Sequence, residues 1–516
     1  MLVSIFNDVL GPVMRGPSSS HCAAALRIGR LARDLMGGKI EKVLVEFDRS
    51  GSLPTTHASQ GSDMGLFGGL LGWDAADERL PDSAKALREA GIELCIETVD
   101  VGDPHPNTYR LTLTNSSETH TLHAISTGGG MIEVLRIDGK PVSFFGDRAE
   151  PLDALGIPER ILQPVLPVLT LPDTSVPFKS ALGMLRYIDL SHPQPLPPPG
   201  AHSSLGKRGE PIPSDSPFPA RNERPGEGQG ERLLGKETPL WKLAAQYEGQ
   251  RGGLTQDEVL AKALELIQIL RRSIAQGIAG THYEDRILGH QSGKFAELMQ
   301  SGKLLGGGAL NRIVLYVTAL MEVKSSMGVI VAAPTAGACA ALPGAVIAMA
   351  EELGLDEMEM AKAFLASGLI GVFIATRWSF AAEVGGCQAE GGSAACMAAA
   401  ALVQLGGGTL TQSLAASSMA LQNMLGLICD PIANRVEAPC LGKNVMAASN
   451  ALSCANMALS GYDPLIPLDE VIETAKRVSA QMPRELRCTN LGGLSISPTS
   501  QAIEERLVQL QLRRQK

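Results

Sequence analysis

The chain has 516 residues, a formal net charge of -9 and 44% hydrophobic residues. This length exceeds what one hydrophobic core usually supports, so two or more domains are expected, and the composition excludes a disordered chain. The acidic balance gives no basic surface for nucleic acid or anionic membrane, which leaves a small molecule as the expected partner.

The first segment, MLVSIFNDVLGPVMRGPSSSH, has no basic region before its short apolar run and reaches Asp8 and Pro12 early. A secretory signal would begin with a basic region and continue with a longer apolar one, so we expect a cytoplasmic protein. The nine cysteines are an odd number in a long chain. They favour buried thiols or metal ligands over a disulfide framework.

Residues 1–185 alternate between β-rich runs and helical segments. Strands are predicted at 42–47, 92–101, 109–114 and 131–139, and helices at 22–36 and 83–90. This alternation is typical of α/β and α+β domains. We therefore predict a sandwich-like α/β domain at the start of a multidomain α+β protein.

The composition then changes abruptly, because residues 192–230 are dense in Pro, Gly, Ser and charge and contain almost nothing to bury. We predict a Pro/Gly-rich linker or disordered insertion over residues 186–236.

Residues 237–516 are dominated by Ala, Leu and Met and predict a mainly α-helical domain. Its helices are expected at 255–278, 309–327, 343–353, 357–375, 393–405, 412–426, 443–460 and 468–481. The uncharged run 329–350 is long enough to span a bilayer. Two prolines interrupt it and it is mostly small residues, so buried helices are the preferred interpretation and no membrane is expected.

Two cysteines flank a glycine pair in GCQAEGGSAACM, residues 386–397. In one continuous helix, Cys387 and Cys396 would be about 13.5 Å apart and on opposite sides, too far to share a site. We expect the glycines to break the helix, so that Ser393 caps a new one and Cys396 lies in its first turn, where the helix dipole favours the thiolate.

A third thiol, Cys339, lies in another Gly-punctuated break. Three such cysteines could converge on one iron-sulfur cluster and leave its fourth iron open, or they could simply be small buried residues. Cys440, which follows a proline, and Cys488 are alternative third ligands. Cys429 and Cys454 are expected at helical packing positions, and Cys22 and Cys95 are expected to be structural.

Several longer motifs carry a resemblance to a known family. They are GPSSSH (16–21), GSLPTTHASQGSD (51–63), HPNT (105–108) and GGG (128–130), followed by MGVIVAAPTAGAC (327–339), GCQAEGGSAACMAAA (386–400), DPIANRVEAPCLGKN (430–444) and GGLSISPT (492–499). Through them the chain resembles the iron-sulfur-dependent L-serine dehydratases (L-serine ammonia-lyases), with the β and α parts of that family fused in this order.

The resemblance implies a lyase of amino-acid metabolism and gluconeogenesis that is expected to be a homodimer. It implies a 4Fe-4S cluster held by Cys339, Cys387 and Cys396, whose open iron acts as a Lewis acid. An open iron can coordinate the carboxylate and hydroxyl of serine while a side chain removes the Cα proton, which leads to pyruvate and ammonia.

The expected base is where the chain departs from the family motif His-Gly-Thr-Asp, which here reads Gln60-Gly61-Ser62-Asp63. Glutamine cannot accept a proton at neutral pH, so His21 and His57 are candidate replacements. The change is compatible with serine dehydration by a rearranged acid-base set. It is also compatible with another β-hydroxy or β-thiol amino acid or a hydroxy acid as substrate, in which case Gln60 acts by hydrogen bonding.

Substrate contacts are expected from polar residues of the same motifs: Ser18, Ser19, Ser20, Thr335, Gly337 and Asn444. Their hydroxyl, amide and backbone N–H groups suit a carboxylate, although caps and turns are the alternative role for such residues. Two other functions remain open. One is a pyridoxal-phosphate dehydratase, which needs a Schiff-base lysine, and the other is a non-catalytic metabolite-binding protein.

Overall fold

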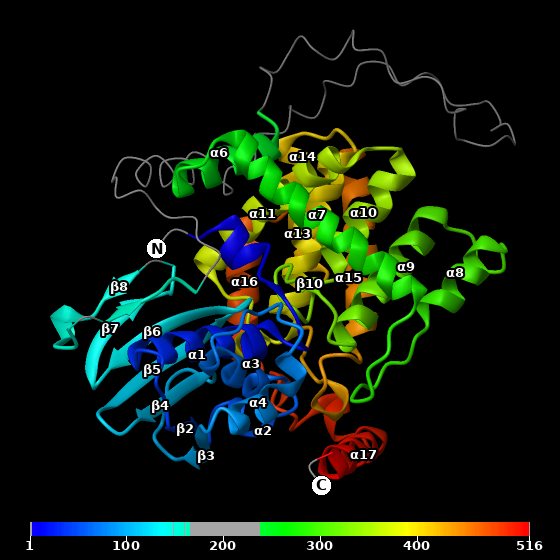
Figure 1. Ribbon diagram of the computed structural model, residues 1–516. Helices are drawn as coiled ribbons and strands as arrows, with labels where there is room; N and C mark the ends of the chain where they lie inside the picture. The colour runs from blue at the N-terminus through cyan, green and yellow to red at the C-terminus, as the bar shows by residue number, and fades with distance from the viewer. Residues whose placement is uncertain (1–2, 148, 159, 166–237, 515–516) are drawn as a thin grey trace, which may run out of the picture.

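The computed structural model describes residues 3–147, 149–158, 160–165 and 238–514. Figure 1 shows a sheet, built from the first part of the chain, beside a larger and mainly helical region. The mixed α/β organisation, with the sheet first and the helices after it, is confirmed. The predicted linker at 186–236 and the boundaries beside it lie outside the described residues.

The sheet of the N-terminal region has six strands in the order β3-β2-β4-β5-β6-β7. Only β2 and β3 are parallel, and the other neighbours are antiparallel. The strands are β2 (Lys42–Asp48), β3 (Glu93–Val99), β4 (Thr108–Thr114), β5 (Thr119–Gly128), β6 (Met131–Ile137) and β7 (Lys140–Phe144); a separate pair joins β8 (Glu150–Pro151) and β9 (Ile161–Leu162). The four predicted strands are present as β2, β3, β4 and β6.

The strands β5 and β7 were not predicted, because their sequences are polar. Six of the ten residues of THTLHAISTG in β5 are Thr, His or Ser, and all of these except Ser126 are at least partly exposed. Strand β7 contains Lys140 and Pro141, which suit an edge strand.

Helices α1 (Ala24–Leu35) and α3 (Ser62–Leu70) cover one face of the sheet, with α2 (Leu53–Thr56) and α4 (Ser83–Glu89) beside them (Figure 1). Leu31 and Leu35 of α1 share a buried cluster with Val43 and Val45 of β2. The cluster explains the period-2 burial of the strands, because alternate side chains point toward these helices.

Glycines allow α1 and α3 to approach with their backbones in contact. A Cβ atom at Gly65 would lie 2.0 Å from the carbonyl oxygen of Cys22, and one at Gly69 would lie 2.1 Å from that of Leu26. No other residue fits at these positions without moving the backbone. The close approach of α1 and α3 holds the turn of residues 60–63, just before Gly65, against the segment that carries His21.

The N-terminal segment leaves the sheet region and packs into the helical one. Ile5 and Val9 of the π-helix η1 (Ile5–Val9) belong to the helical core, and β1 (Val13–Met14) pairs with β10 (Ile330–Val331). Figure 1 shows η1 between the sheet and α11. The two halves are therefore interlaced, which brings the motif after β1 to the boundary between them.

A buried carboxylate anchors this segment. Glu248 of α6 (Leu240–Gly252) accepts hydrogen bonds from Ser4 Oγ at 2.7 Å and from the backbone N–H of Ile5 at 2.8 Å, and it pairs with Arg251 at 2.7 Å. Its side chain is fully buried.

We expect Glu248→Ala to lower the free energy of unfolding by roughly 3–5 kcal/mol, because Arg251 would be left buried without its counter-ion. Denaturant unfolding measures the change. Glu265→Ala, at an exposed position of the same helical region, is the matched control and should stay within about 0.5 kcal/mol of the wild type. Equal losses in the two variants would contradict the anchoring role.

The helical region surrounds α13, whose Ala-rich sequence lets α10, α11, α14 and α15 pack closely against it. Besides α6, its helices are α7 (Gln256–Ala279), α8 (Ser292–Gln300), α9 (Gly308–Ser325), α10 (Ala341–Leu353), α11 (Glu357–Arg377), α12 (Ala382–Gly385), α13 (Ser393–Leu405), α14 (Leu410–Gln422), α15 (Cys440–Leu459), α16 (Leu468–Gln481) and α17 (Pro498–Arg514). Each predicted helix is present, with its ends shifted by at most a few residues.

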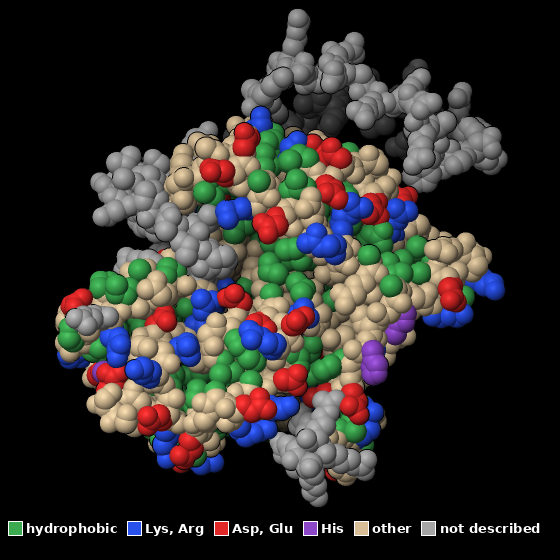
Figure 2. All heavy atoms as spheres, in the orientation of Figure 1, with side chains coloured by type: hydrophobic (Ala, Val, Ile, Leu, Met, Phe, Trp, Pro, Cys, Tyr) green, Lys and Arg blue, Asp and Glu red, His purple; other side chains and the backbone are tan. Residues whose placement is uncertain are grey.

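The apolar run 329–350 is not a single helix, because it contains β10, a loop and then α10. Among the described helices, α11 is long and apolar enough to cross a membrane, but 78% of its apolar window is buried inside the protein, as in a core helix. On the face shown in Figure 2, basic and acidic side chains are interspersed, and the described residues there form no broad basic surface.

Candidate active site and metal centre

Three ligand-type side chains meet beside α12 and α13. The sulfur atoms of Cys387 and Cys429 and a carboxylate oxygen of Glu390 all lie within 4.8 Å of one another. Cys488 joins them, since Cys387, Cys429 and Cys488 form one buried cluster and Cys429 makes side-chain hydrogen bonds with both other thiols. Backbone hydrogen bonds between Cys429 and the 486–488 segment, at 2.9 and 3.0 Å, fix this arrangement.

The charges around this group favour a thiolate at Cys387. Its hydrogen bond with Cys429, followed by the nearby ammonium of Lys443, lowers the pKa of the Cys387 thiol, although burial acts to raise it. Lys443 Nζ lies 3.7 Å from Cys387 Sγ and 2.7 Å from an oxygen of Asp430. The pKa of Cys429 is raised well above its usual value, because its hydrogen bonds to Cys387 and Cys488 hold its proton.

Glu390 is the acidic member of the group. Burial, and then the negative charge of Cys387, raise the pKa of its carboxyl to about 8. A Cβ atom at residue 337 would come within 2.7 Å of Glu390 Oε2, so the APTAG loop reaches this carboxyl only because Gly337 has no side chain.

A fourth thiol, Cys440, begins α15. Burial, and then the negative charge of Cys387, raise the pKa of Cys440, which places its thiol within electrostatic reach of the group. The thiols around the group therefore come from four separate segments of the chain.

The structure brings together a different set of thiols from Cys339, Cys387 and Cys396. The glycine pair does not break the helix, because the π-helix η5 (Gln388–Gly392) continues directly into α13, and Ser393 has helical φ and ψ instead of capping it. Cys396 is then on the order of 12 Å along the axis from Cys387. Its burial raises its pKa to about 12, whereas a thiolate was expected.

Cys339 stays a predicted ligand, whereas the helical placement of Cys429 needs correction. Cys339 is fully buried, and this burial raises the pKa of its thiol to about 12. Glu390 is the member of the ligand group whose charge also acts on this thiol. Cys429, expected at a helical packing position, lies outside the helices in the stretch before Asp430 and Pro431. That Asp-Pro pair was the available signal, since a helix usually ends at or before the residue that precedes a proline, here Asp430 next to Cys429.

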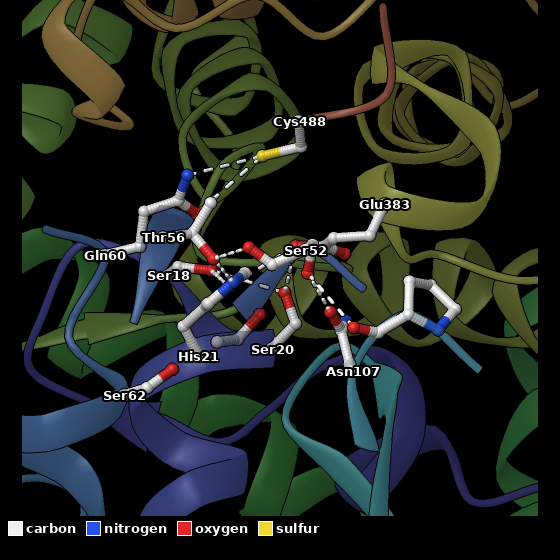
Figure 3. Close-up of polar contacts among 12 residues, drawn as sticks. Ser18, Ser20, His21, Ser52, Thr56, Gln60, Ser62, Asn107, Glu383 and Cys488 are labelled. Atoms are coloured by element: carbon white, nitrogen blue, oxygen red, sulfur yellow. Dashed lines mark hydrogen bonds and ion pairs between the residues drawn. The ribbon is translucent and has the colours of Figure 1, made fainter. Parts of the chain in front are cut away.

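His21 lies at the boundary between the two regions, at the centre of a polar network (Figure 3). The π-helix η2 (Ser19–Ala23) carries it. Nε2 lies 2.9 Å from Thr56 Oγ1, and Nδ1 lies 3.2 Å from Ser18 Oγ and 3.3 Å from Glu383 Oε1. Burial lowers the pKa of His21 more than the carboxylate of Glu383 raises it, so the imidazole is neutral at pH 7 and able to accept a proton.

Glu383 of α12 was not singled out from the sequence, although a lone acid in an apolar run was a usable signal. Its Oε1 faces His21 and accepts a hydrogen bond from Ser20 Oγ at 3.2 Å. Its Oε2 is buried without a hydrogen-bond partner among the described residues. Such an oxygen is available to a donor from a bound ligand.

Gln60 and His57 lie in different surroundings. Gln60 is fully buried, and its Nε2 donates to Asn434 Oδ1 at 2.8 Å and to Cys488 Sγ at 3.4 Å, as Figure 3 shows for Cys488. His57 is partly exposed and pairs with Asp63 at 2.7 Å. Gln60 therefore connects the His21 side of the site to the thiols, whereas His57 points toward the surface.

The predicted substrate residues divide into two groups. Ser18 and Ser20 belong to the His21 network. Ser19 Oγ accepts a hydrogen bond from the backbone N–H of Ala336 at 3.1 Å. Thr335 makes a side-chain hydrogen bond to Glu390. Asn444 accepts from Ala340 and Ala341 and donates to Gly337 and Cys440, all at backbone atoms. Asn444 has no hydrogen-bonding capacity left for a substrate, so it holds the APTAG loop on α15.

The thiol group fits a metal centre. Its donors are soft, buried sulfur atoms of separate segments, the set that iron-sulfur clusters and zinc prefer. The ammonium of Lys443, which helps to lower the pKa of Cys387, favours the negative charge that such ligands carry.

Comparison with known proteins identifies the family of this chain. Residues 235–495 match the family described as serine dehydratase alpha chain. The probable L-serine dehydratase alpha chain of Bacillus subtilis is 38% identical over 253 residues, which are 49% of this chain and 84% of that protein. The L-serine dehydratase alpha chain of Peptoniphilus asaccharolyticus is 37% identical over 265 residues, 51% of this chain and 91% of that protein.

A relative of the other type also matches. The probable L-serine dehydratase beta chain of Bacillus subtilis is 40% identical over 144 residues, 28% of this chain and 64% of that protein. Similarity to both types in one polypeptide agrees with fused α and β parts. The chain belongs to the L-serine dehydratase family, whose members are lyases.

Proposed function

We propose that this protein is an iron-sulfur-dependent L-serine ammonia-lyase that releases pyruvate and ammonia. The observation that carries the proposal is the buried group of Cys387, Cys429 and Cys488, which lies next to the His21 network. The alpha chain of Peptoniphilus asaccharolyticus, which matches half of this chain, is named an L-serine dehydratase.

The residues proposed to hold a 4Fe-4S cluster are Cys387 and Cys429, with the third thiol supplied by Cys440 or Cys488, which flank them. When bound, an open iron would supply a Lewis acid for the carboxylate and β-hydroxyl of serine. Lys443 balances the charge of the thiolates through its contact with Cys387. Burial of the whole group keeps water away from it.

The proton chemistry is assigned to His21. Because the imidazole is neutral and Glu383 faces its Nδ1, Nε2 is the atom that can remove the Cα proton, and the carboxylate then stabilises the imidazolium. For this step the substrate must displace Thr56 from Nε2. The free Oε2 of Glu383 is placed to accept a hydrogen bond from the substrate ammonium.

The products follow from the balance of atoms. Serine loses the Cα proton and the β-hydroxyl as one water molecule, and the resulting aminoacrylate tautomerises to an imine. One water molecule then converts the imine to pyruvate and ammonia. No oxidant or reductant is consumed, which agrees with a cluster used as a Lewis acid.

Gln60 favours a second candidate class of substrate. Its amide lies between Asn434 and Cys488, where the family motif has a histidine. A hydrogen-bonding amide at this position suits another β-hydroxy or β-thiol amino acid or a hydroxy acid. In that case Gln60→Ala changes the preference between substrates more than the overall rate.

A substrate screen distinguishes these possibilities. Anaerobically reconstituted protein is incubated with L-serine, L-threonine, L-cysteine and L-alanine, and ammonia is measured. We expect release from L-serine and none from L-alanine, which lacks a leaving group. Ammonia from none of the first three, with the cluster intact, would overturn the proposal, and binding without turnover would support a metabolite-binding protein.

The cellular setting belongs to the same proposal. A cytoplasmic homodimer is proposed, on the basis of the family resemblance. Sedimentation of the reconstituted protein measures the assembly.

A further inference from the structure

A cavity of about 610 Å³ lies between the sheet region and the helical region. Ser59, Gly61 and Phe67 line it from one side, and Lys324, Arg435 and Glu437 from the other. Gly61 directly follows Gln60, which contacts Cys488. One residue of the cavity wall is therefore the chain neighbour of a residue that contacts the proposed active site.

Lys324 in this wall is an unusual residue, because its side chain is buried with no acceptor for its ammonium. It is 1% exposed, and its Nζ has no hydrogen-bond partner among the described residues. The hydroxyl of Ser325 beside it is also buried without a partner. Two adjacent buried donors without acceptors are costly unless a ligand satisfies them.

The carboxylates near Lys324 accept hydrogen bonds from other donors, and Glu437 interacts with the charge of Lys324 without a hydrogen bond to its ammonium. Glu322 accepts hydrogen bonds from the backbone N–H groups of Gln291 and Ser292 and from the Ser292 hydroxyl. Glu437 accepts from the N–H groups of Ile287 and Leu288, each at 3.0 Å.

The last turn of α9 does not satisfy Lys324 either. A helix C-terminus favours a cation through its dipole. However, the carbonyl oxygens of Glu322, Val323 and Lys324 already accept from the N–H groups of residues 326–328. Among the described residues, therefore, no acceptor forms a hydrogen bond with the Lys324 ammonium.

The position of Lys324 suits a carboxylate ligand. Its ammonium is a buried cation without a hydrogen-bond acceptor among the described residues, on the wall of a cavity, and a carboxylate is the charged acceptor that such a group binds. Glu383 in the His21 network has an unpartnered oxygen. A buried cation and an acid with a free oxygen match the two charges of an amino-acid zwitterion.

We infer that Lys324 binds the α-carboxylate of the amino-acid substrate, which enters through the cavity between the two regions. This assignment rests on the proposed function for the identity of the ligand. It makes Lys324 a specificity-determining residue that selects for a carboxylate next to the reacting carbon. The Ser325 hydroxyl supplies a second donor on the same wall.

The test compares the iron-loaded wild type with Lys324→Met, Lys324→Arg and the exposed-site control Lys303→Met. L-alanine is the binding probe because it carries the same carboxylate and ammonium but cannot react, and ethanolamine is the probe without a carboxylate. We expect Lys324→Met to weaken L-alanine binding and to raise KM for L-serine by roughly 10- to 100-fold, with kcat little changed. Lys324→Arg should restore part of the loss, and Lys303→Met should lose nothing.

Thermal unfolding separates binding from folding. Without ligand, Lys324→Met should melt at or above the wild-type temperature, because a buried unpaired charge is removed. L-alanine should stabilise the wild type but not Lys324→Met, and ethanolamine should stabilise neither. A lower melting temperature of the unliganded variant, or unchanged L-alanine binding, would overturn the inference.

The outcomes also separate this inference from the proposed function. If wild-type protein releases no ammonia from L-serine but loses L-alanine binding on Lys324→Met, the carboxylate site stands and the proposed reaction fails. If L-serine is deaminated with the same KM in Lys324→Met and the wild type, the reaction stands and the inference fails.

Discussion

Replacing Cys387 or Cys429 with Ala is expected to abolish iron binding and turnover. These two thiols belong to the group of ligand atoms within 4.8 Å, and loss of either leaves too few sulfur ligands for a 4Fe-4S cluster. Iron and sulfide analysis after anaerobic reconstitution should fall from about four irons per chain to almost none.

Cys396→Ala is the matched control, because Cys396 is equally buried but lies along α13, away from the group. It should keep its iron and most of its turnover, with only a packing cost in stability. Loss of iron in Cys396→Ala, with retention in Cys429→Ala, would show that the ligand set predicted from sequence is the correct one.

The same analysis identifies the third ligand. Cys488 lies in hydrogen-bonding contact with Cys429, whereas Cys440 is within electrostatic reach of Cys387. If Cys440→Ala loses the iron, Cys440 is the third ligand, and if Cys488→Ala loses it, Cys488 is. If both variants keep full iron, neither flanking thiol is a ligand and the proposed set fails.

The second large effect is expected at His21. His21→Ala should lower kcat roughly 100- to 10,000-fold, the usual contribution of a general base, while the iron content stays unchanged. His57→Ala is the control, since His57 pairs with Asp63 near the surface and should change turnover little. A greater loss in His57→Ala than in His21→Ala would reverse the assignment.

The pH profile gives a second readout for His21. Burial lowers the pKa of His21 from its usual value of 6.5, despite the facing Glu383 and with a further small decrease from His57. The neutral, active form therefore persists below pH 6.5 and is lost as the pH falls through the lowered pKa. The acid limb of kcat/KM should lie below pH 6.5, and a limb well above that value would indicate another base.

Much of the fold could be predicted because it follows local patterns. The helices of residues 237–516 have clear Gly and Pro boundaries, and Thr255 and Thr409 form capping boxes at the starts of α7 and α14. The strands with a regular apolar alternation were found, whereas β5 and β7 were missed because their outward residues are polar.

The candidate site was harder to predict, because packing decided two local choices. Gly391 and Gly392 favour a break in the helix. The helix nevertheless continues through them, because Leu421 and Met424 pack so closely over Gly392 that only a small residue fits there. An isolated β-bridge pairs Cys429 with Arg487 and so brings Cys488 to Cys429 across a large sequence separation, which no local sequence pattern predicts. His21 could be found because its whole motif is polar.

The most direct test of the central claim is the rate of pyruvate formation from L-serine at increasing iron loading. The protein is purified without oxygen, stripped with a chelator and reconstituted in steps, and iron and pyruvate are measured on the same samples. The account predicts a rate that rises with bound iron and reaches its maximum at about four irons per chain. Full turnover of L-serine by the stripped protein, or none by the fully loaded one, would contradict it.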